Sequence, residues 1–168
     1  MKKLLLTYIT FGILAISCQK QTERIETKLV NCIYENYKDQ GTKFKKLLSD
    51  FEQLLIDEKI LKNRTGKSYK AIFEKIVVDN NFDYNPSESF LTKIIELGMP
   101  KNEAFRNCQS ELREKSKNEF SKSYELQTVL DSIFKNSVNI SPSIVATGIL
   151  SVLNEKDFEL DYYKMSVF

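Results

Sequence analysis

The stretch TKFKKLLSDFEQLLIDEKIL, residues 42–61, decides the fold class of this chain of 168 residues. Its apolar side chains recur at spacings of three and four residues, at Phe44, Leu47, Leu48, Phe51, Leu54 and Leu55. That spacing places them on one face of an α-helix and leaves lysines and carboxylates on the other face. A helix with one apolar face is not stable alone and needs partners to cover it. The stretch therefore predicts a helix that packs within a larger core.

The same helical period returns in most of the chain after residue 24. Apolar faces of this kind run through residues 25–37, 68–80, 103–120, 123–136 and 139–157, and a further helix is expected between Pro86 and Gly98. Glycine and proline mark the breaks, at Gly41, Gly66, Pro86, Gly98, Pro100 and Pro142. No stretch alternates as a half-buried strand does. The sequence therefore predicts an all-α fold, a single compact domain of about seven or eight helices over residues 25–168.

Two helix starts are predicted from capping patterns. Asn85, Pro86 and Glu88 stand in the order of a cap, a first-turn proline and a capping-box glutamate. Ser141 followed by Pro142 is a second cap with a first-turn proline. Both patterns predict that a helix begins directly after the capping residue.

The last part of the chain predicts a buried helix and a final short one. The run 144–153 is strongly apolar, but at about ten residues it is too short to span a membrane. Asp157 is expected to cap a last helix that runs through Tyr162 and Met165. The apolar end of the chain, residues 162–168, either docks into the core or belongs to a chain that continues.

The first 18 residues, MKKLLLTYITFGILAISC, have the layout of an export signal. Lys2 and Lys3 form a basic start, and residues 4–17 carry no charge. As a helix this uncharged run would span roughly 21 Å, less than the roughly 30 Å hydrocarbon core of a bilayer. A signal peptide is therefore favoured over a permanent transmembrane helix.

The end of this leader resembles the lipobox of bacterial lipoprotein precursors. Leu14, Ala15, Ile16 and Ser17 lead into Cys18, with Ala15 standing where Leu is commoner. The resemblance covers only the leader. It implies that diacylglycerol is attached to the Cys18 sulfur, that the chain is cut before Cys18, and that the new amine is usually acylated. The lipid is transferred to the Cys18 thiolate because the thiolate is the nucleophile. Two or three acyl chains would anchor the protein firmly, whereas one chain binds only marginally.

On this interpretation the chain consists of a signal peptide over 1–17, the lipidated Cys18 with a polar tether over 18–24, and a helical domain over 25–168. Gln19 stands where an Asp would resemble the inner-membrane retention signal of enteric bacteria, and residues 19–24 lack the acidic cluster that resembles a surface-export tag of Bacteroidota lipoproteins. We therefore expect a cell-envelope protein on the outer membrane, facing the periplasm. The alternative is an ordinary secreted helical protein, cut before Cys18 at the Ala-x-Ser pattern.

Lipid on Cys18 would leave Cys32 and Cys108 as an even pair. Both cysteines lie on apolar faces of predicted helices, and export to an oxidising compartment permits a disulfide between them. The alternative is two reduced cysteines that pack as small hydrophobic side chains. A redox-active pair is not expected, because the chain has no Cys-x-x-Cys spacing.

Charge and composition exclude several classes of protein. The full chain has 25 Lys and Arg against 23 Asp and Glu, and because the leader contains Lys2 and Lys3, the remainder has 23 of each sign. A balanced chain has no electrostatic footprint for nucleic acid, which is not an expected partner. Histidine is absent, which excludes Ser-His-Asp and Cys-His hydrolases and His-rich zinc enzymes. No cofactor is expected.

Two acidic patterns do not amount to sites. Residues 79–90, DNNFDYNPSESF, resemble a calcium loop at alternate positions, but Tyr84 replaces the glycine at the sixth position and Phe90 the glutamate at the twelfth. No metal site is therefore predicted. Acidic pairs such as Asp57 and Glu58 are interpreted as surface charge, because spacing along a helical chain cannot place two carboxylates across a cleft.

The sequence predicts no catalytic residue. It predicts a membrane-anchored bacterial lipoprotein whose helical domain serves binding or assembly. The expected partners are membrane lipid, through the acyl chains on Cys18, and an envelope protein. The alternative is an envelope enzyme of the glycan hydrolase type that uses carboxylates. A cleft with two facing carboxylates of opposed pKa would support that alternative.

Overall fold

The computed structural model describes residues 23–81, 89–98, 100–136 and 139–167. Within these ranges all regular structure is helical, so the prediction of an all-α fold with seven or eight helices is confirmed. The elements are α1 (Ile25–Glu35), α2 (Thr42–Asp57), α3 (Gly66–Asp79), α4 (Phe90–Leu97), α5 (Glu103–Asn118), α6 (Lys122–Asn136), α7 (Pro142–Val152), the 3₁₀ turn η1 (Asp157–Glu159) and α8 (Asp161–Val167).

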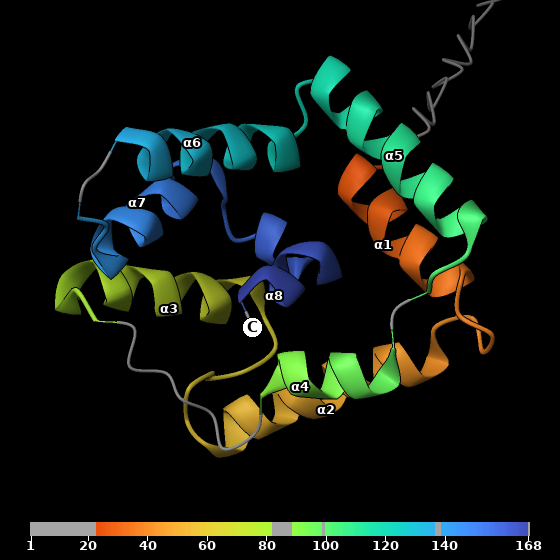
Figure 1. Ribbon diagram of the computed structural model, residues 1–168. Coiled ribbons are helices and arrows are strands. Elements are labelled where there is room, and N and C mark those ends of the chain that lie inside the picture. The colour runs from red at the N-terminus through yellow and green to blue at the C-terminus, as the bar shows by residue number, and fades with distance from the viewer. Residues whose placement is uncertain (1–22, 82–88, 99, 137–138, 168) are drawn as a thin grey trace, which may run out of the picture.

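The helices form three groups around the short helix α8 (Figure 1). Helix α7 lies between α3 and α6, α1 lies along α5, and α2 lies along α4. Helix α8 contacts α1 and η1 at the centre. Tyr69 of α3 and Tyr163 of α8 have no exposed surface, and Phe158 of η1 is 1% exposed. The main core therefore lies where α3, η1 and α8 meet.

The apolar face predicted for residues 42–61 is the face that α2 buries. Phe44, Leu48, Phe51 and Leu55 are all 5% exposed or less. The ring of Phe51 packs against that of Phe90 with centroids 5.1 Å apart, which holds α4 on α2. The period of the sequence therefore identifies the correct face of this helix.

Two helix starts have well-formed caps. Ser141 accepts a hydrogen bond from the Ile144 N–H at 3.3 Å and Pro142 is the first residue of α7, as predicted. Helix α4 begins after Ser89, whose side chain accepts from the Thr92 N–H at 3.3 Å. The cap predicted at residues 85–88 lies outside the described residues.

The turn between α4 and α5 follows the prediction in part. Gly98 ends α4 with a φ of 76°, a conformation that glycine adopts without strain. Pro100 does not open the next helix directly. Asn102 is the cap of α5, because its side-chain oxygen accepts from the Phe105 N–H at 2.7 Å.

Helix α2 ends earlier than predicted, at Asp57 rather than near residue 61. The Lys59 N–H bonds to the Ile56 carbonyl at 3.0 Å and the Ile60 N–H to that of Leu55 at 2.8 Å, the two bonds of a Schellman motif. Lys59 takes the left-handed position, with a φ of 61°, where glycine is usual. In a continued helix Leu61 would point about 120° away from Leu55. The turn instead lets Leu61 reach the core, where it is 1% exposed.

The chain after α7 corrects a further prediction. Asp157 does not cap a helix that runs through Met165; it starts η1, and α8 begins four residues later at Asp161. Asp157 is 2% exposed and accepts from the Asn154 N–H at 2.8 Å. The buried Asp157 carboxylate forms an ion pair with Arg24 and does not cap a helix. Part of the apolar end of the chain docks into the core, because Tyr163 has no exposed surface.

Candidate functional site

Cys18, the predicted lipid attachment site, and the leader before it lie outside the described residues, which begin at Glu23. None of the described helices is both long and apolar enough to cross a bilayer. The described chain starts at the end of the predicted tether, and Arg24 joins that tether to the fold.

Arg24 is held by two buried carboxylates. Its Nη1 atom lies 2.6 Å from Oδ1 of Asp157 in η1, and its Nε atom lies 3.1 Å from Oε2 of Glu26 in α1. Both acidic residues are 2% exposed, while 36% of the Arg24 side chain remains exposed. Partly buried ion pairs of this kind are screened less by salt than surface pairs. The clamp fixes the point at which the chain enters the domain.

Glu26 connects three helices. Its Oε1 atom accepts from the Ser123 N–H of α6 at 2.9 Å and from the Tyr163 hydroxyl of α8 at 3.0 Å. Burial alone raises the pKa of the Glu26 carboxyl, but the backbone N–H groups of Glu26 and Ser123, together with Arg24, outweigh burial and leave that pKa below its ordinary value. Glu26 is therefore ionised at neutral pH and acts as a structural acceptor.

A third buried carboxylate, that of Glu52 in α2, also bonds to α8. Glu52 Oε1 accepts from the Tyr69 hydroxyl at 2.7 Å and pairs with Lys164 Nζ at 2.9 Å. The Tyr34 hydroxyl donates to Asp161 at 2.8 Å. Burial and the neighbouring carboxylate raise the pKa of Tyr69 far above its ordinary value, so its phenol remains a donor. Helix α8 is thus tied by polar bonds to α1, α2 and, through Glu26, α6.

These pairings weigh against carboxylate catalysis at the centre of the domain. A glycosidase needs two carboxyl groups that face a substrate across an open cleft, one of them protonated. Glu26 and Asp157 are bridged by a guanidinium, and Glu52 is paired with a lysine. All three are 5% exposed or less. Their arrangement stabilises the fold and gives no access to a substrate.

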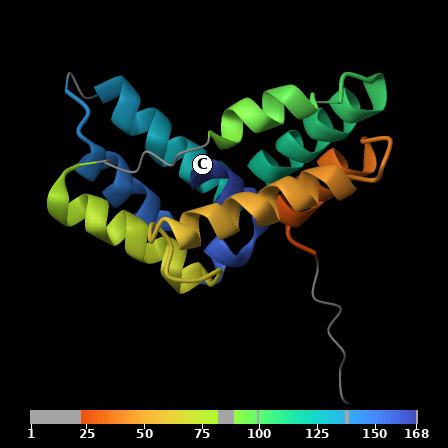
Figure 2. The same ribbon diagram turned by 90° about the horizontal axis from the view of Figure 1, so that it is seen from below.

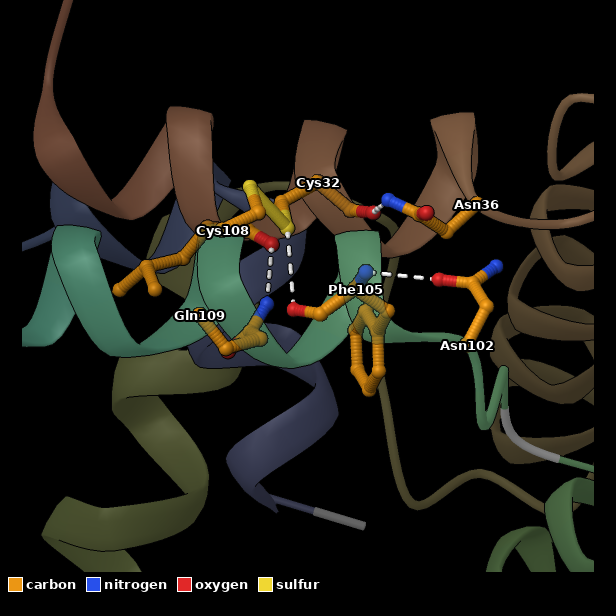
Figure 3. The surroundings of a disulfide bond; sticks show 7 residues. Cys32, Asn36, Asn102, Phe105, Cys108 and Gln109 are labelled. Atoms are coloured by element: carbon orange, nitrogen blue, oxygen red, sulfur yellow. Dashed lines mark hydrogen bonds between the residues drawn. A yellow bond between two sulfur atoms is a disulfide. The ribbon is translucent and has the colours of Figure 1, made fainter.

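Cys32 of α1 and Cys108 of α5 are joined in a disulfide, the first of the two alternatives that the sequence leaves open (Figure 3). Their Cα atoms lie 6.3 Å apart and their positions differ by 76 residues. Beside the bond, Gln109 donates to the Leu29 carbonyl at 3.1 Å. The Phe105 carbonyl lies 3.9 Å from the Cys32 sulfur, a packing contact, since a bridged sulfur has no proton to donate. The helix that follows the tether is therefore covalently fixed to α5.

A pocket of about 670 Å³ opens between the end of α2, the loop behind it and the first turns of α3. This volume is in the range of roughly 300–1,000 Å³ that is common for small-molecule sites. No acidic residue is among those that line it. The lining consists of Lys59, Lys62, Lys67 and Lys75, the polar residues Asn63, Thr65 and Ser68, and the apolar residues Ile56, Ile60, Leu61, Ala71 and Ile72.

The loop that forms one wall of this lysine pocket is pinned on both sides. The Ser68 hydroxyl of α3 accepts from the N–H groups of Lys62 at 2.8 Å and Asn63 at 3.2 Å. The Arg64 guanidinium donates to the hydroxyl and carbonyl oxygens of Ser49 in α2 at 3.1 and 3.2 Å. The pocket is therefore formed by the fold itself, as binding sites for small molecules usually are.

Two other pockets are less suited to a polar ligand or a reaction. One of about 300 Å³ lies between α3 and α7 and is lined almost wholly by apolar side chains such as Phe73 and Val145. Another of about 640 Å³ lies on the second half of α5 and its C-cap, and its lining includes Glu111, Glu114 and the capping residue Glu119. All of its lining residues come from this one helix and its cap, so no second element supplies an opposite wall.

Comparison with protein-family models, curated proteins and solved structures finds no match for this chain. The candidate site therefore rests on the geometry of the lysine pocket. Within the described ranges, no group of three or more His, Cys, Asp or Glu side chains is placed to hold a metal ion. Residues 82–88 of the calcium-like loop lie outside these ranges.

One feature of the sequence indicates the lysine pocket, although the spacing of the apolar residues does not. That feature is the local charge. Residues 59–73 include four lysines and Arg64 but no acidic residue, in a chain whose 25 basic residues nearly balance its 23 acidic ones. The turn at residues 63–66 folds this basic run back on itself. A local excess of one sign on both sides of a turn predicts a concave basic surface.

Proposed function

We propose that this chain is a bacterial lipoprotein in which the helical domain serves as a binding module at the membrane. The leader is removed, Cys18 carries the lipid, and residues 19–24 connect the lipid to the domain. The support for the anchor is the order of basic, apolar and small residues before Cys18. The bond between Cys32 and Cys108 agrees with this reading, because disulfides persist in oxidising compartments such as the periplasm.

One observation carries the binding part of the proposal. The lysine pocket is preformed and has no carboxylate in its lining, while the buried carboxylates of the domain are held in ion pairs. A site of this composition holds a ligand by charge and apolar contact, and it offers no acid–base pair for hydrolysis. We place the protein on the outer membrane, facing the periplasm, where an envelope protein is a further partner.

The anchor is tested by the mass of the mature N-terminus. The full precursor is expressed in a bacterium that processes lipoproteins, and we expect a chain that begins at a diacylglyceryl-Cys18. The Cys18→Ala variant should stay unprocessed or leave the membrane fraction, while Cys32→Ala should still be lipidated. An unmodified Cys18 amine, or a retained leader in such a host, would exclude the lipoprotein function.

The location is tested separately, by membrane fractionation and by protease treatment of intact cells. We expect recovery in the outer-membrane fraction and protection from external protease. Recovery in the inner membrane, or rapid cleavage in intact cells, would contradict the placement and leave the lipid anchor itself intact.

A further inference from the structure

We propose that the lysine pocket binds an anionic amphiphile, with a phosphate or carboxylate head group at the lysines and an aliphatic chain on the apolar floor. This names the ligand class of the binding module and rests on the function proposed above. The head group chemistry is shared by lipids in the membrane and by free amphiphiles in the periplasm, and the experiment below separates these sources.

The charge of the pocket selects an anion. Lys59, Lys62 and Lys67 are exposed at its mouth, and none of them takes part in an ion pair within the described part of the chain. This contrasts with Lys46, Lys70 and Lys115, each of which pairs with an acidic residue four positions later. Three uncompensated cations around one hollow attract a negative ligand over about one Debye length, roughly 10 Å at 0.1 M salt.

The floor of the pocket selects an aliphatic body. Leu61 and Ile72 are buried, at 1% and 5% exposed, and Ile56 and Ile60 are half-buried beside them. Ala71 of α3 is exposed within the same lining. Apolar surface that a ligand covers contributes about 25 cal/mol per Å² removed from water. A bare phosphate would leave this floor uncovered, whereas an alkyl chain covers it.

The left-handed turn that brings Leu61 into the core also places Lys59 in the lining of the pocket. A non-glycine residue with a φ of 61° is strained, and a glycine at this position of a Schellman motif would not be. Glycine would relieve this strain but would remove one of the cations that line the pocket. Lys59→Gly should therefore have two opposite effects: a higher midpoint of thermal unfolding and weaker ligand binding.

The turn that carries the pocket packs on the segment that holds Arg24 at the entry of the tether. Gly66 at the start of α3 packs so closely on the segment before η1 that a Cβ atom there would collide with the Glu155 carbonyl, and Asp157 of the same segment holds Arg24. The loop between α2 and α3 and the start of α1 both lie toward the lower edge in Figure 2, but they are well separated in the view of Figure 1. The tether between Cys18 and Arg24 spans at most about 20 Å when extended. On the proposed anchor, this short tether keeps the whole domain, and the pocket with it, within reach of the membrane that carries it.

The experiment uses residues 18–168 with Cys18→Ser, the chain that removal of the leader would leave, so that neither an attached lipid nor the apolar leader competes for the pocket. Isothermal titration compares three probes: dodecyl phosphate below its micelle concentration, inorganic phosphate, and the uncharged dodecyl maltoside. We expect dodecyl phosphate to bind at least tenfold more tightly than either of the others, and its affinity to fall with added salt. Equal binding of inorganic phosphate would overturn the amphiphile, equal binding of the maltoside would overturn the anion, and no binding of any probe would overturn the site.

Matched variants localise the binding. Lys62→Gln and Lys67→Gln should each weaken dodecyl phosphate roughly threefold to fivefold, the loss expected for one cation near the head group in a well-solvated site. Lys43→Gln removes the same charge about 24 Å away along α2 and should change nothing. Ala71→Glu, which places a carboxylate in the pocket, should weaken binding at least tenfold more than the uncharged Ala71→Gln. Unchanged affinity in the lysine variants and in Ala71→Glu would refute the proposal.

Vesicle flotation separates the sources of the ligand. Vesicles of phosphatidylcholine with one quarter phosphatidylglycerol are compared with phosphatidylcholine alone. If the protein floats with the anionic vesicles and dodecyl phosphate releases it, the ligand is a lipid of the bilayer. If the protein binds monomeric dodecyl phosphate but does not float with the vesicles, the ligand is a free amphiphile. Retention that the lysine variants do not weaken would overturn the site. The titrations use a chain without a lipid anchor, and the mass test of lipidation does not involve the pocket. A failed titration would therefore overturn the ligand and leave the lipid anchor intact, and a failed mass test would overturn the anchor and leave the ligand intact.

Discussion

Removal of the disulfide is expected to cost a large part of the stability of the domain. The bond joins positions 76 residues apart, so that the unfolded oxidised chain carries a long closed loop. In the chain-entropy model such a loop lowers the entropy of the unfolded state by about 15 cal/mol/K, which is about 4.5 kcal/mol at 25 °C. A domain of ordinary size has an unfolding free energy of about 5–15 kcal/mol. Reduction should therefore leave the fold marginal.

The double variant Cys32→Ala/Cys108→Ala should lose slightly more than chemical reduction does. Cys32 is 2% exposed, so its replacement by alanine also leaves a small cavity beside α5. Deletion of one buried methyl-sized group costs about 1 kcal/mol. We expect a loss of about 4.5 kcal/mol on reduction and about 5–6 kcal/mol in the double variant. The difference between these two losses of unfolding free energy measures the packing of the cysteine side chains alone.

The assay is urea unfolding followed by far-ultraviolet circular dichroism, on the Cys18→Ser chain, oxidised and reduced. The slope of the free energy against urea should rise on reduction, because the unfolded chain without its cross-link exposes more surface. A loss below about 1 kcal/mol would refute the loop-entropy reasoning. Two free thiols in the denatured, unreduced chain would refute the bond itself. Each single variant, Cys32→Ala or Cys108→Ala, should resemble the double variant, since either one breaks the same cross-link.

Three further predictions concern single positions. Glu26→Gln should lower the unfolding free energy by about 2–3 kcal/mol at pH 7, because a charged acceptor is lost and an amide group meets Arg24. Since the folded pKa of Glu26 is depressed, its contribution is present above the unfolded pKa of about 4.3 and is lost as the pH falls through the lower folded pKa, so urea titrations of the two proteins should converge in acid. Gly66→Ala should destabilise by about 1–3 kcal/mol in thermal unfolding although alanine favours helices, because its Cβ atom meets the backbone of Glu155; a stabilised variant would contradict that close approach. Ser141→Ala should cost about 1 kcal/mol through loss of the α7 cap, and an unchanged melting midpoint would show that Pro142 suffices.

The sequence predicts features that depend on a few neighbouring residues. The buried face of α2 follows from the spacing of its apolar side chains, and the start of α7 follows from Ser141 and Pro142. In both cases the determining interactions lie within one or two turns of helix. Local signals of this kind are present in the sequence whatever the rest of the chain does.

The end of α2 is not predicted, because two demands compete there. Residues up to Leu61 continue a helical pattern, and lysine is a good helix former. The tertiary structure instead needs Leu61 in the core, and the chain leaves the helix at Lys59 to place it there. Burial of a leucine is worth about 1.5–3 kcal/mol, which exceeds the strain of one left-handed residue.

The buried carboxylates were equally hidden in the sequence. Glu26 and Glu52 stand among other charged residues in helical stretches, where the usual reading is exposed surface. Their partners are distant in the chain: Ser123 is 97 residues from Glu26, and Tyr163 is 137 residues from it. Nothing in the local spacing distinguishes these two glutamates from solvated ones. Only the fold brings their partners to them, which is also why Asp157 looked like a helix cap.

Arg24 links the architecture of the domain to its proposed place at a membrane. If the anchor pulls on residues 19–23, the load reaches Arg24, and the ion pair with Asp157 passes it to η1 and the core. Helix α1 cannot fray from its start, because Glu26 is bonded to α6 and α8 and Cys32 is bonded to α5. A short tether joined to a frayed terminus would let the domain turn freely. Joined to this clamp, it limits how far the lysine pocket can turn away from the bilayer surface.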